Sequence, residues 1–140
     1  MKFYQKEIVL PRFERGCHLI TELLRKEMPE ITSISIGQFQ AFIKHTSASL
    51  TINENADSTV RSDFEAHMNI MVPEDAPYYI HTFEGSDDMP AHIKASLMGS
   101  SIQIPISGGR LNLGIWQGIY LCEHRNSASG RSLILSCFGS

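Results

Sequence analysis

The sequence predicts an α+β fold in a single domain over residues 1–140, with a mostly antiparallel β-sheet, two longer helices and one short helix. Three observations lead to this class. Apolar residues at helical spacing are confined to a few stretches, alternating apolar residues dominate the C-terminal part, and Gly-rich or Ser-rich turns separate the alternating stretches. The length suits one domain that buries its own core.

The N-terminal part is predicted to run from strand to helix to strand. Residues 3–10 form the first strand, and residues 16–28 carry apolar side chains at the spacing of a helix. Over residues 31–43 the apolar residues alternate with other residues, first at even-numbered and then at odd-numbered positions. This change predicts either two strands joined near Gly37 or one bulged strand. The end of this segment brings His45 onto the sheet.

The middle of the chain is predicted to hold the second long helix, an irregular loop and the short helix. A helical stripe of apolar residues follows the candidate N-caps Asp57 and Ser58. Residues 73–89 show no periodicity, and an irregular loop of this length in a small domain is often functional. The acidic pair Asp87 and Asp88 precedes the short helix, where Asp88 is expected to act as a cap that complements the helix dipole.

The C-terminal part is predicted to be β-rich, with strands over residues 101–106, 111–123 and 131–138. In the middle strand Trp116 is expected to pack in the core. Gln117 beside it is a polar group in an apolar strand, so it needs a partner such as a ligand or an adjacent chain.

Composition narrows the classes of partner. Hydrophobic residues make up 42% of the chain and charged residues 19%, with a net charge of −3, which offers no electrostatic footprint for nucleic acid. The three cysteines are widely spaced and lack the pairing typical of zinc sites or secreted disulfide scaffolds. With no signal-peptide pattern and no apolar run of membrane-spanning length, we expect a soluble cytoplasmic protein that does not bind membranes.

Three histidines are candidate metal ligands: His45 after a strand, His81 in the irregular loop and His92 at the start of the short helix. Three imidazoles with an open position are typical of a catalytic zinc site, and nearby carboxylates such as Glu84 and Asp87 can orient them. The alternative is that each histidine satisfies a structural hydrogen bond. Cationic side chains could contact an anionic ligand or simply form a solvated surface; they are Lys44, Lys94, Arg110, Arg125 and Arg131.

The polar strings of this chain closely resemble the YjbQ family over nearly its whole length. They are residues 45–50 (HTSASL), 53–54 (NE), Asp63, 81–94, 109–118 and 123–125 (EHR). Family members are described as secondary thiamine-phosphate synthases. The resemblance implies an α+β fold assembled as a homotrimer, and a site to which His45, His81 and His92 contribute metal or ligand contacts.

The same resemblance implies further site residues. Glu54, Asp63, Gln117 and Glu123 belong to the shared pattern, and Glu84 adds a candidate catalytic carboxylate. Ser47, Asp87, Lys94 and Arg131 are expected to contact a bound cofactor or phosphorylated small molecule. The family often has two nearby arginines at the last hairpin, whereas Ser132 follows Arg131 here. An anion site that needs both arginines is therefore in doubt.

These residues leave three hypotheses. The first is a homotrimeric thiamine-phosphate synthase, which joins a pyrimidine pyrophosphate to a thiazole phosphate and releases pyrophosphate at a site that needs a divalent metal. The second is a metal-dependent hydrolase or lyase in which Glu54 or Glu84 acts as the base. The third is a non-catalytic trimeric metabolite or metal binder. Histidine ligands favour zinc, and magnesium is the alternative metal.

Overall fold

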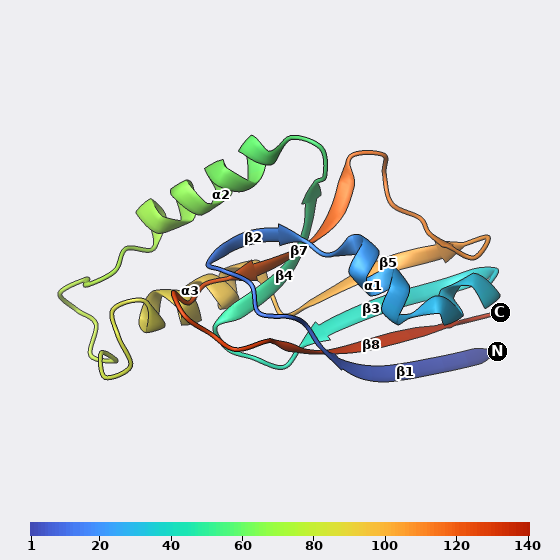
Figure 1. Cartoon of the computed structure of the whole chain (residues 1–140), viewed down its shortest axis with the longest axis horizontal. Coiled ribbons are helices and arrows are strands. Elements are labelled where there is room, and N and C mark those ends of the chain that lie inside the picture. The colour runs from blue at the N-terminus through green and yellow to red at the C-terminus, as the bar shows by residue number, and fades with distance from the viewer.

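The order of helices and strands is set out in Figure 1, a computed structural model that describes residues 1–140. The strands are β1 (Lys2–Val9), β2 (Gly16–Leu19), β3 (Ile36–Ile43), β4 (Ala48–Glu54), β5 (Ser101–Ser107), β6 (Arg110–Leu111), β7 (Gln117–Glu123) and β8 (Ser132–Gly139). The helices are α1 (Thr21–Glu27), the 3₁₀ helix η1 (Pro29–Ser33), α2 (Ser58–Met71) and α3 (Asp88–Met98). The α+β class is confirmed.

The strands form two sheets in which every paired neighbour is antiparallel. The larger sheet has the order β1-β8-β3-β5-β6 and the smaller one β2-β7-β4. Alternation is regular in β5, where Ile102, Ile104 and Ile106 are buried between exposed neighbours. This period of two is the sequence signal that predicted the strand, since one face of the sheet meets the core and the other meets water.

The core lies where the two sheets and the α1–η1 segment meet. Phe39 and Leu135 enter it from the larger sheet, Leu50 and Leu121 from the smaller one, and Leu24 from α1, all at most 1% exposed. Each side chain of this size stabilises the fold by about 1.5–3 kcal/mol when fully buried. Mutual packing of the sheets therefore holds the ends of β4 and β7, which carry much of the site described below.

One predicted helix is wrong in its first part. Residues 16–19 form β2, which pairs with β7 through Gly16↔Glu123 and Leu19↔Tyr120, and only residues 21–27 are helical. The apolar residues of this stretch fit a helix or a strand about equally well. The decision rests on a partner strand that lies far away in the sequence, which a local pattern does not contain.

The predicted strand over residues 111–123 is also wrong in its first half. β6 ends at Leu111 and β7 begins at Gln117, so Trp116 precedes the strand and is 60% exposed rather than packed in the core. Gln117 closes the intervening turn, because its side-chain Oε1 accepts a hydrogen bond from the Gly114 N–H at 2.7 Å. The β segment predicted over residues 31–43 is wrong in its first part, because residues 29–33 form the 3₁₀ helix η1. From Ile36 the chain forms one strand without a bulge, whose register with β5 and β8 is continuous.

The long loop predicted between the second and third helices is confirmed: residues 73–87 contain no helix or strand. α3 follows this loop and packs against β4. Loop and α3 lie at the end of the molecule opposite to the two termini (Figure 1). None of the helices is both long enough and apolar enough to cross a membrane.

Candidate functional site

The densest group of potential metal ligands lies where the long loop enters α3. Asp88 is the first residue of α3, His92 lies one turn later on the same face, and His81 comes from the loop. The Nε2 atoms of His81 and His92 lie 2.7 Å and 3.1 Å from Oδ2 of Asp88. One ligand atom from each residue falls within 4.8 Å of the other two. We call these three residues the His-Asp-His cluster.

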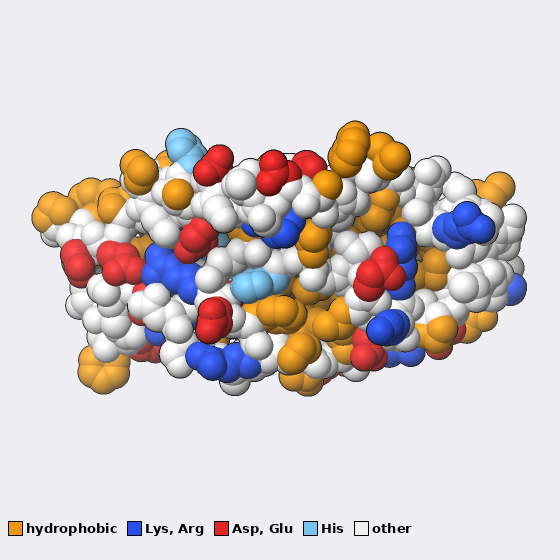
Figure 2. Space-filling view, turned by 45° about the horizontal axis from the view of Figure 1, so that its top comes forward, with side chains coloured by type: hydrophobic (Ala, Val, Ile, Leu, Met, Phe, Trp, Pro, Cys, Tyr) orange, Lys and Arg blue, Asp and Glu red, His pale blue; other side chains and the backbone are white.

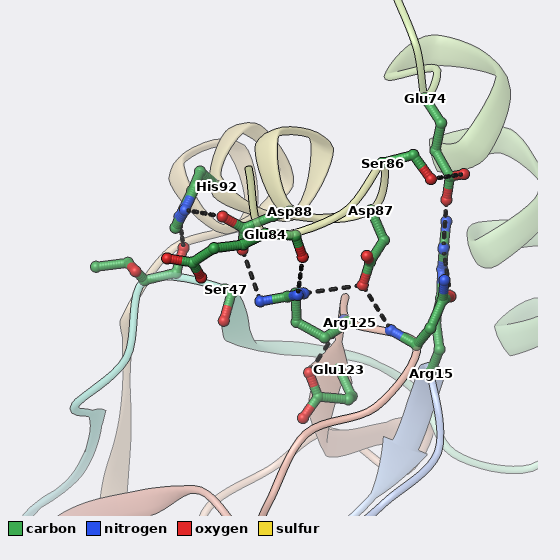
Figure 3. A network of polar contacts seen from close by, with 12 residues as sticks. Arg15, Ser47, Glu74, Glu84, Ser86, Asp87, Asp88, His92, Glu123 and Arg125 are labelled. Carbon is green, nitrogen blue, oxygen red and sulfur yellow. Dashed lines mark hydrogen bonds and ion pairs between the residues drawn. The ribbon is translucent and has the colours of Figure 1, made fainter. Parts of the chain in front are cut away.

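The orientation of His92 is fixed by a backbone carbonyl. Its Nδ1 lies 3.0 Å from the Thr46 oxygen, which can only accept a hydrogen bond, so Nδ1 carries the proton (Figure 3). In a neutral imidazole the Nε2 lone pair then faces the Asp88 carboxylate, and two lone pairs at that separation repel. A proton or a metal cation between Nε2 and the carboxylate removes this conflict.

Arg125 fixes the carboxylate of Asp88. Its Nη1 donates to Oδ1 of Asp88 at 2.7 Å, its Nε to Asp87 at 2.8 Å and its Nη2 to the Glu84 carbonyl at 3.0 Å (Figure 3). Oδ2 of Asp88 is thereby turned toward the histidines. Burial raises the pKa of Asp88, but the hydrogen bond from His81 and the charge of Arg125 outweigh it and lower that pKa overall. The cluster therefore contains an ionised carboxylate at neutral pH.

A second ionic layer lies beneath the cluster. Arg131 donates to both carboxylate oxygens of Glu123, at 2.7 Å and 2.5 Å, and to the Ser47 carbonyl at 3.3 Å. Lys94 is completely buried, and its Nζ donates to Oδ1 of Asn69 at 2.7 Å. Ser47, Lys94 and Arg131 were predicted to contact a cofactor. The structure places them close to the cluster, but the Ser47 carbonyl, the Lys94 ammonium and the Arg131 guanidinium are directed to protein partners.

His45 lies next to the cluster rather than in it. It lines a pocket of about 290 Å³ that is also lined by His92 and Ser96. Its Nε2 accepts a hydrogen bond from the Ser132 N–H at 2.8 Å, which leaves the proton on Nδ1. Burial and the charge of Arg131 lower the pKa of His45, so the ring is neutral. The structure thus brings together two of the three predicted metal-binding histidines and gives the third a place beside them.

Three other predicted residues lie elsewhere. Glu54 and Gln117 face each other at the opposite end of the β4–β7 ladder from Ala48 and Glu123, roughly 20 Å away at the usual rise of a strand. Glu54 accepts hydrogen bonds from the backbone N–H groups of residues 56 and 57. Asp63 is exposed on α2. Of the predicted carboxylates, Glu84, Asp87 and Glu123 remain near the cluster, Glu84 with an exposed side chain.

Asp88 is the site residue that sequence reasoning missed, because it was expected only to cap the helix. The N-cap position is Asp87, no side-chain capping bond is made there, and Asp88 directs both oxygens to His81, His92 and Arg125. The spacing Asp88-x-x-x-His92 could have revealed it, since residues four apart share a helix face. Arg125 was named only among the cations that could contact an anion, and no local signal linked it to Asp88, which lies far away in the sequence.

Comparison with known proteins gives a consistent result. The family model described as "UPF0047 protein YjbQ-like" matches residues 6–140. The UPF0047 protein YjbQ of Salmonella typhimurium is 45% identical over 137 residues, which cover 98% of this chain and 99% of that protein. YugU of Bacillus subtilis is 40% identical over 92 residues, 66% of this chain and 67% of that protein.

Solved structures share the same fold. A crystal structure from Clostridium acetobutylicum, described as an uncharacterized conserved protein of the yjbq/upf0047 family, is 37% identical with a TM-score of 0.83, covering 95% of this chain and 99% of that one. A YbjQ-like protein of unknown function from Sulfolobus solfataricus has a TM-score of 0.87 at 21% identity, covering 99% of both chains. At that identity the likeness concerns the fold alone.

Proposed function

This chain belongs to the UPF0047 YjbQ-like family, and from the geometry of its His-Asp-His cluster we propose that it is a metal-dependent hydrolase acting on a small molecule. The cluster offers two imidazole nitrogens and one carboxylate oxygen. Such a mixed set suits zinc or a similar transition metal better than magnesium, which prefers oxygen ligands and water.

The observation that carries the proposal is the arrangement of His92 between a carbonyl and a carboxylate. With Nδ1 donating to Thr46, the free Nε2 lies 3.1 Å from Asp88, and His81 lies at 2.7 Å from the same oxygen. Ligand atoms bound to one tetrahedral metal ion at about 2.1 Å are themselves about 3.4 Å apart. The three ligand atoms lie within 4.8 Å of one another, so modest shifts of the side chains would gather them around one ion. The Thr46 carbonyl is the kind of outer contact that orients a metal-binding imidazole.

Three protein ligands leave an open coordination position. A metal ion bound by His81, Asp88 and His92 would supply Lewis-acid chemistry, activating a water and polarising a substrate carbonyl or phosphoryl oxygen. In our proposal the neutral His45 donates a hydrogen bond from Nδ1 to a substrate in the adjacent pocket. Glu84, whose carboxylate is exposed on the loop and extends toward His92 in the view of Figure 3, takes the proton from the attacking water.

Thiamine-phosphate synthesis is the second candidate, favoured by the family resemblance. The departing pyrophosphate would need cationic partners in addition to a metal. The guanidinium of Arg125 is engaged with Asp87 and Asp88, that of Arg131 with Glu123, and Lys94 is buried on Asn69. Because these cationic groups are already engaged by protein partners, hydrolysis makes fewer demands on this site than pyrimidine transfer does.

The proposal includes assembly as a homotrimer in the cytoplasm. Two apolar side chains of the loop that carries His81, Ile80 and Phe83, are 97% and 98% exposed. Figure 2 shows apolar side chains gathered at the end of the molecule where α2 and this loop lie. Exposed apolar side chains of this kind are typical of subunit contacts. A monomeric mass in solution would contradict this part of the proposal.

Measurements of metal binding and of turnover together test the proposal of a metal-dependent hydrolase. We expect tag-free protein, stripped with a chelator, to bind one Zn²⁺ per chain and to hydrolyse p-nitrophenyl phosphate or p-nitrophenyl acetate. We expect His92→Ala to lose both properties, and Glu84→Gln to keep the metal and lose turnover. His67→Ala is the matched control, since His67 is exposed on α2 away from the cluster.

The outcomes separate the candidates. Absence of stoichiometric metal overturns the proposal, while metal binding without turnover of either ester points to a non-catalytic binder. Formation of thiamine phosphate from its two precursors, lost in His92→Ala, would favour the synthase instead.

A further inference from the structure

Two of the three cysteines lie directly opposite each other in the smaller sheet. Cys17 of β2 pairs with Cys122 of β7 in the antiparallel register, and their Sγ atoms are 3.3 Å apart. Both are free thiols. Opposed residues of such a ladder have Cβ atoms about 4.5–5.5 Å apart, close to the separation that a disulfide needs. The two sulfurs are already in contact, so a small approach of the two strands together with side-chain rotation brings them into bonding distance.

The two thiols differ in access. Cys17 is partly exposed and lines a pocket of about 580 Å³ together with Arg61 and Glu65. Cys122 is 1% exposed, and Cys137 lies in the other sheet, completely buried on β8. A small reagent that enters this pocket meets Cys17 first, and Cys122 is then reached only through Cys17.

The two thiols also differ in acidity, and the more accessible thiol, Cys17, is also the more acidic one. The hydrogen bond from the Cys122 thiol lowers the pKa of Cys17, and the charges of Arg61 and Lys94 act in the same direction against the effect of burial. The same hydrogen bond, together with burial, raises the pKa of Cys122. Since the thiolate is the nucleophile, the accessible cysteine is also the reactive one.

We propose that Cys17 and Cys122 form a reversible dithiol site that is oxidised by hydrogen peroxide or an alkyl hydroperoxide. The Cys17 sulfur attacks the peroxide, so that an S–O bond forms, the O–O bond breaks and water or an alcohol leaves. Cys122 then loses its proton and attacks the Cys17 sulfenic acid: the S–S bond forms, the S–O bond breaks and a water leaves. Two thiols are oxidised and one peroxide is reduced, and a thiol reductant reverses the change.

This site is independent of the proposed hydrolase. None of its sulfurs belongs to the His-Asp-His cluster, and metal binding by that cluster is not needed for the oxidation. Its failure would leave the proposed function untouched, and the reverse also holds.

Thiol counting on the full chain tests the site. After treatment with hydrogen peroxide, alkylation and mass spectrometry, we expect one of the three thiols to remain, on Cys137, and digestion to give a peptide that links Cys17 to Cys122. Dithiothreitol should restore all three thiols. Cys122→Ser should stop at a sulfenic acid on Cys17 that dimedone traps, and Cys17→Ser should slow the oxidation of Cys122 by about tenfold or more.

Cys137→Ser is the matched control, because it removes a buried thiol from the other sheet and should leave the linked peptide unchanged. Circular dichroism verifies that each variant is folded. Retention of all three thiols in folded wild-type protein overturns the proposal. So does oxidation confined to Cys137 or to links between chains.

Discussion

Both ends of the β4–β7 ladder carry a glutamate, and they differ in what their polar side chains do. At the Ala48↔Glu123 end, Glu123, His124 and Arg131 are buried and bonded to partners from other elements. At the Glu54↔Gln117 end, the side chains bond to backbone N–H groups a few residues away and shape local turns.

The difference shows how a polar residue becomes available for function. A carboxylate in a turn is satisfied locally and solvated, so it holds its own turn and little else. A buried carboxylate must be compensated by distant groups, and these groups determine where its second oxygen points. Asp88 is such a case, because Arg125 takes one oxygen and leaves the other to the histidines. The two ends can be compared experimentally.

The largest effect is expected from Glu123→Gln, which leaves the buried Arg131 guanidinium without its counter-charge. Breaking one partner of a buried pair costs about 3–5 kcal/mol, so urea unfolding should show a loss of that order. Glu54→Gln at the opposite end should cost about 1 kcal/mol or less, since only turn hydrogen bonds are weakened. Equal losses in the two variants would contradict the contrast drawn between the ends.

An intermediate effect is expected from Arg125→Met in zinc titrations. The substitution releases Oδ1 of Asp88 and the loop carbonyl of Glu84, so the ligand set loses its orientation. Loss of such an outer contact typically lowers metal affinity by about 10–100-fold. Arg110→Met, on an exposed residue of β6, is the control and should bind zinc as the wild type does. An unchanged affinity in Arg125→Met would show that Asp88 needs no such support.

The smallest expected effect is a decrease in the free energy of unfolding as the pH falls, caused by His124. Burial lowers the pKa of His124 from 6.5 to about 3, with the nearby Lys94 and Arg131 charges acting in the same direction. Above pH 6.5 the ring is neutral in both the folded and the unfolded chain. As the pH falls from 6.5 toward 3, only the unfolded chain gains this proton, so the free energy of unfolding decreases.

At pH 5.5 the contribution of His124 to this loss is about 1 kcal/mol relative to neutral pH. His124→Gln keeps a polar group for the Ser49 hydroxyl, which lies 2.8 Å from Nε2, and removes the titration. Urea unfolding of both proteins at pH 7 and 5.5 should therefore show a smaller decrease for the variant. An identical decrease would mean that His124 is not the group that titrates.

Sequence reasoning reached the fold class and the irregular loop because both depend on local periodicity. The alternation in β5 and the lack of pattern over residues 73–87 are properties of neighbouring positions. β2 was misassigned to a helix because its strand character comes from pairing with β7, which lies far along the chain. Trp116 was misplaced because a side-chain bond from Gln117 to Gly114 interrupts an apparently continuous strand.

The candidate site was predicted in its location and only partly in its members. His81 and His92 were identified from residue type and context, and they meet in the structure. Arg125 and Asp88 are joined across 37 positions of sequence, so neither spacing nor composition could connect them. Gln117 was singled out as a polar group in an apolar strand, and both it and Glu54 belong to the shared family pattern. Neither argument says at which end of a ladder a residue lies.

The pairing of β1 with β8 has a practical consequence for work on this protein. Lys2 stands opposite Gly139, so the two chain termini emerge next to each other, at the end of the molecule opposite to α3 (Figure 1). An affinity tag, a fluorophore or a surface anchor on either terminus stays remote from His92. Because the termini are adjacent, a short linker is enough to join them in a circularly permuted chain with new ends opened in an exposed loop.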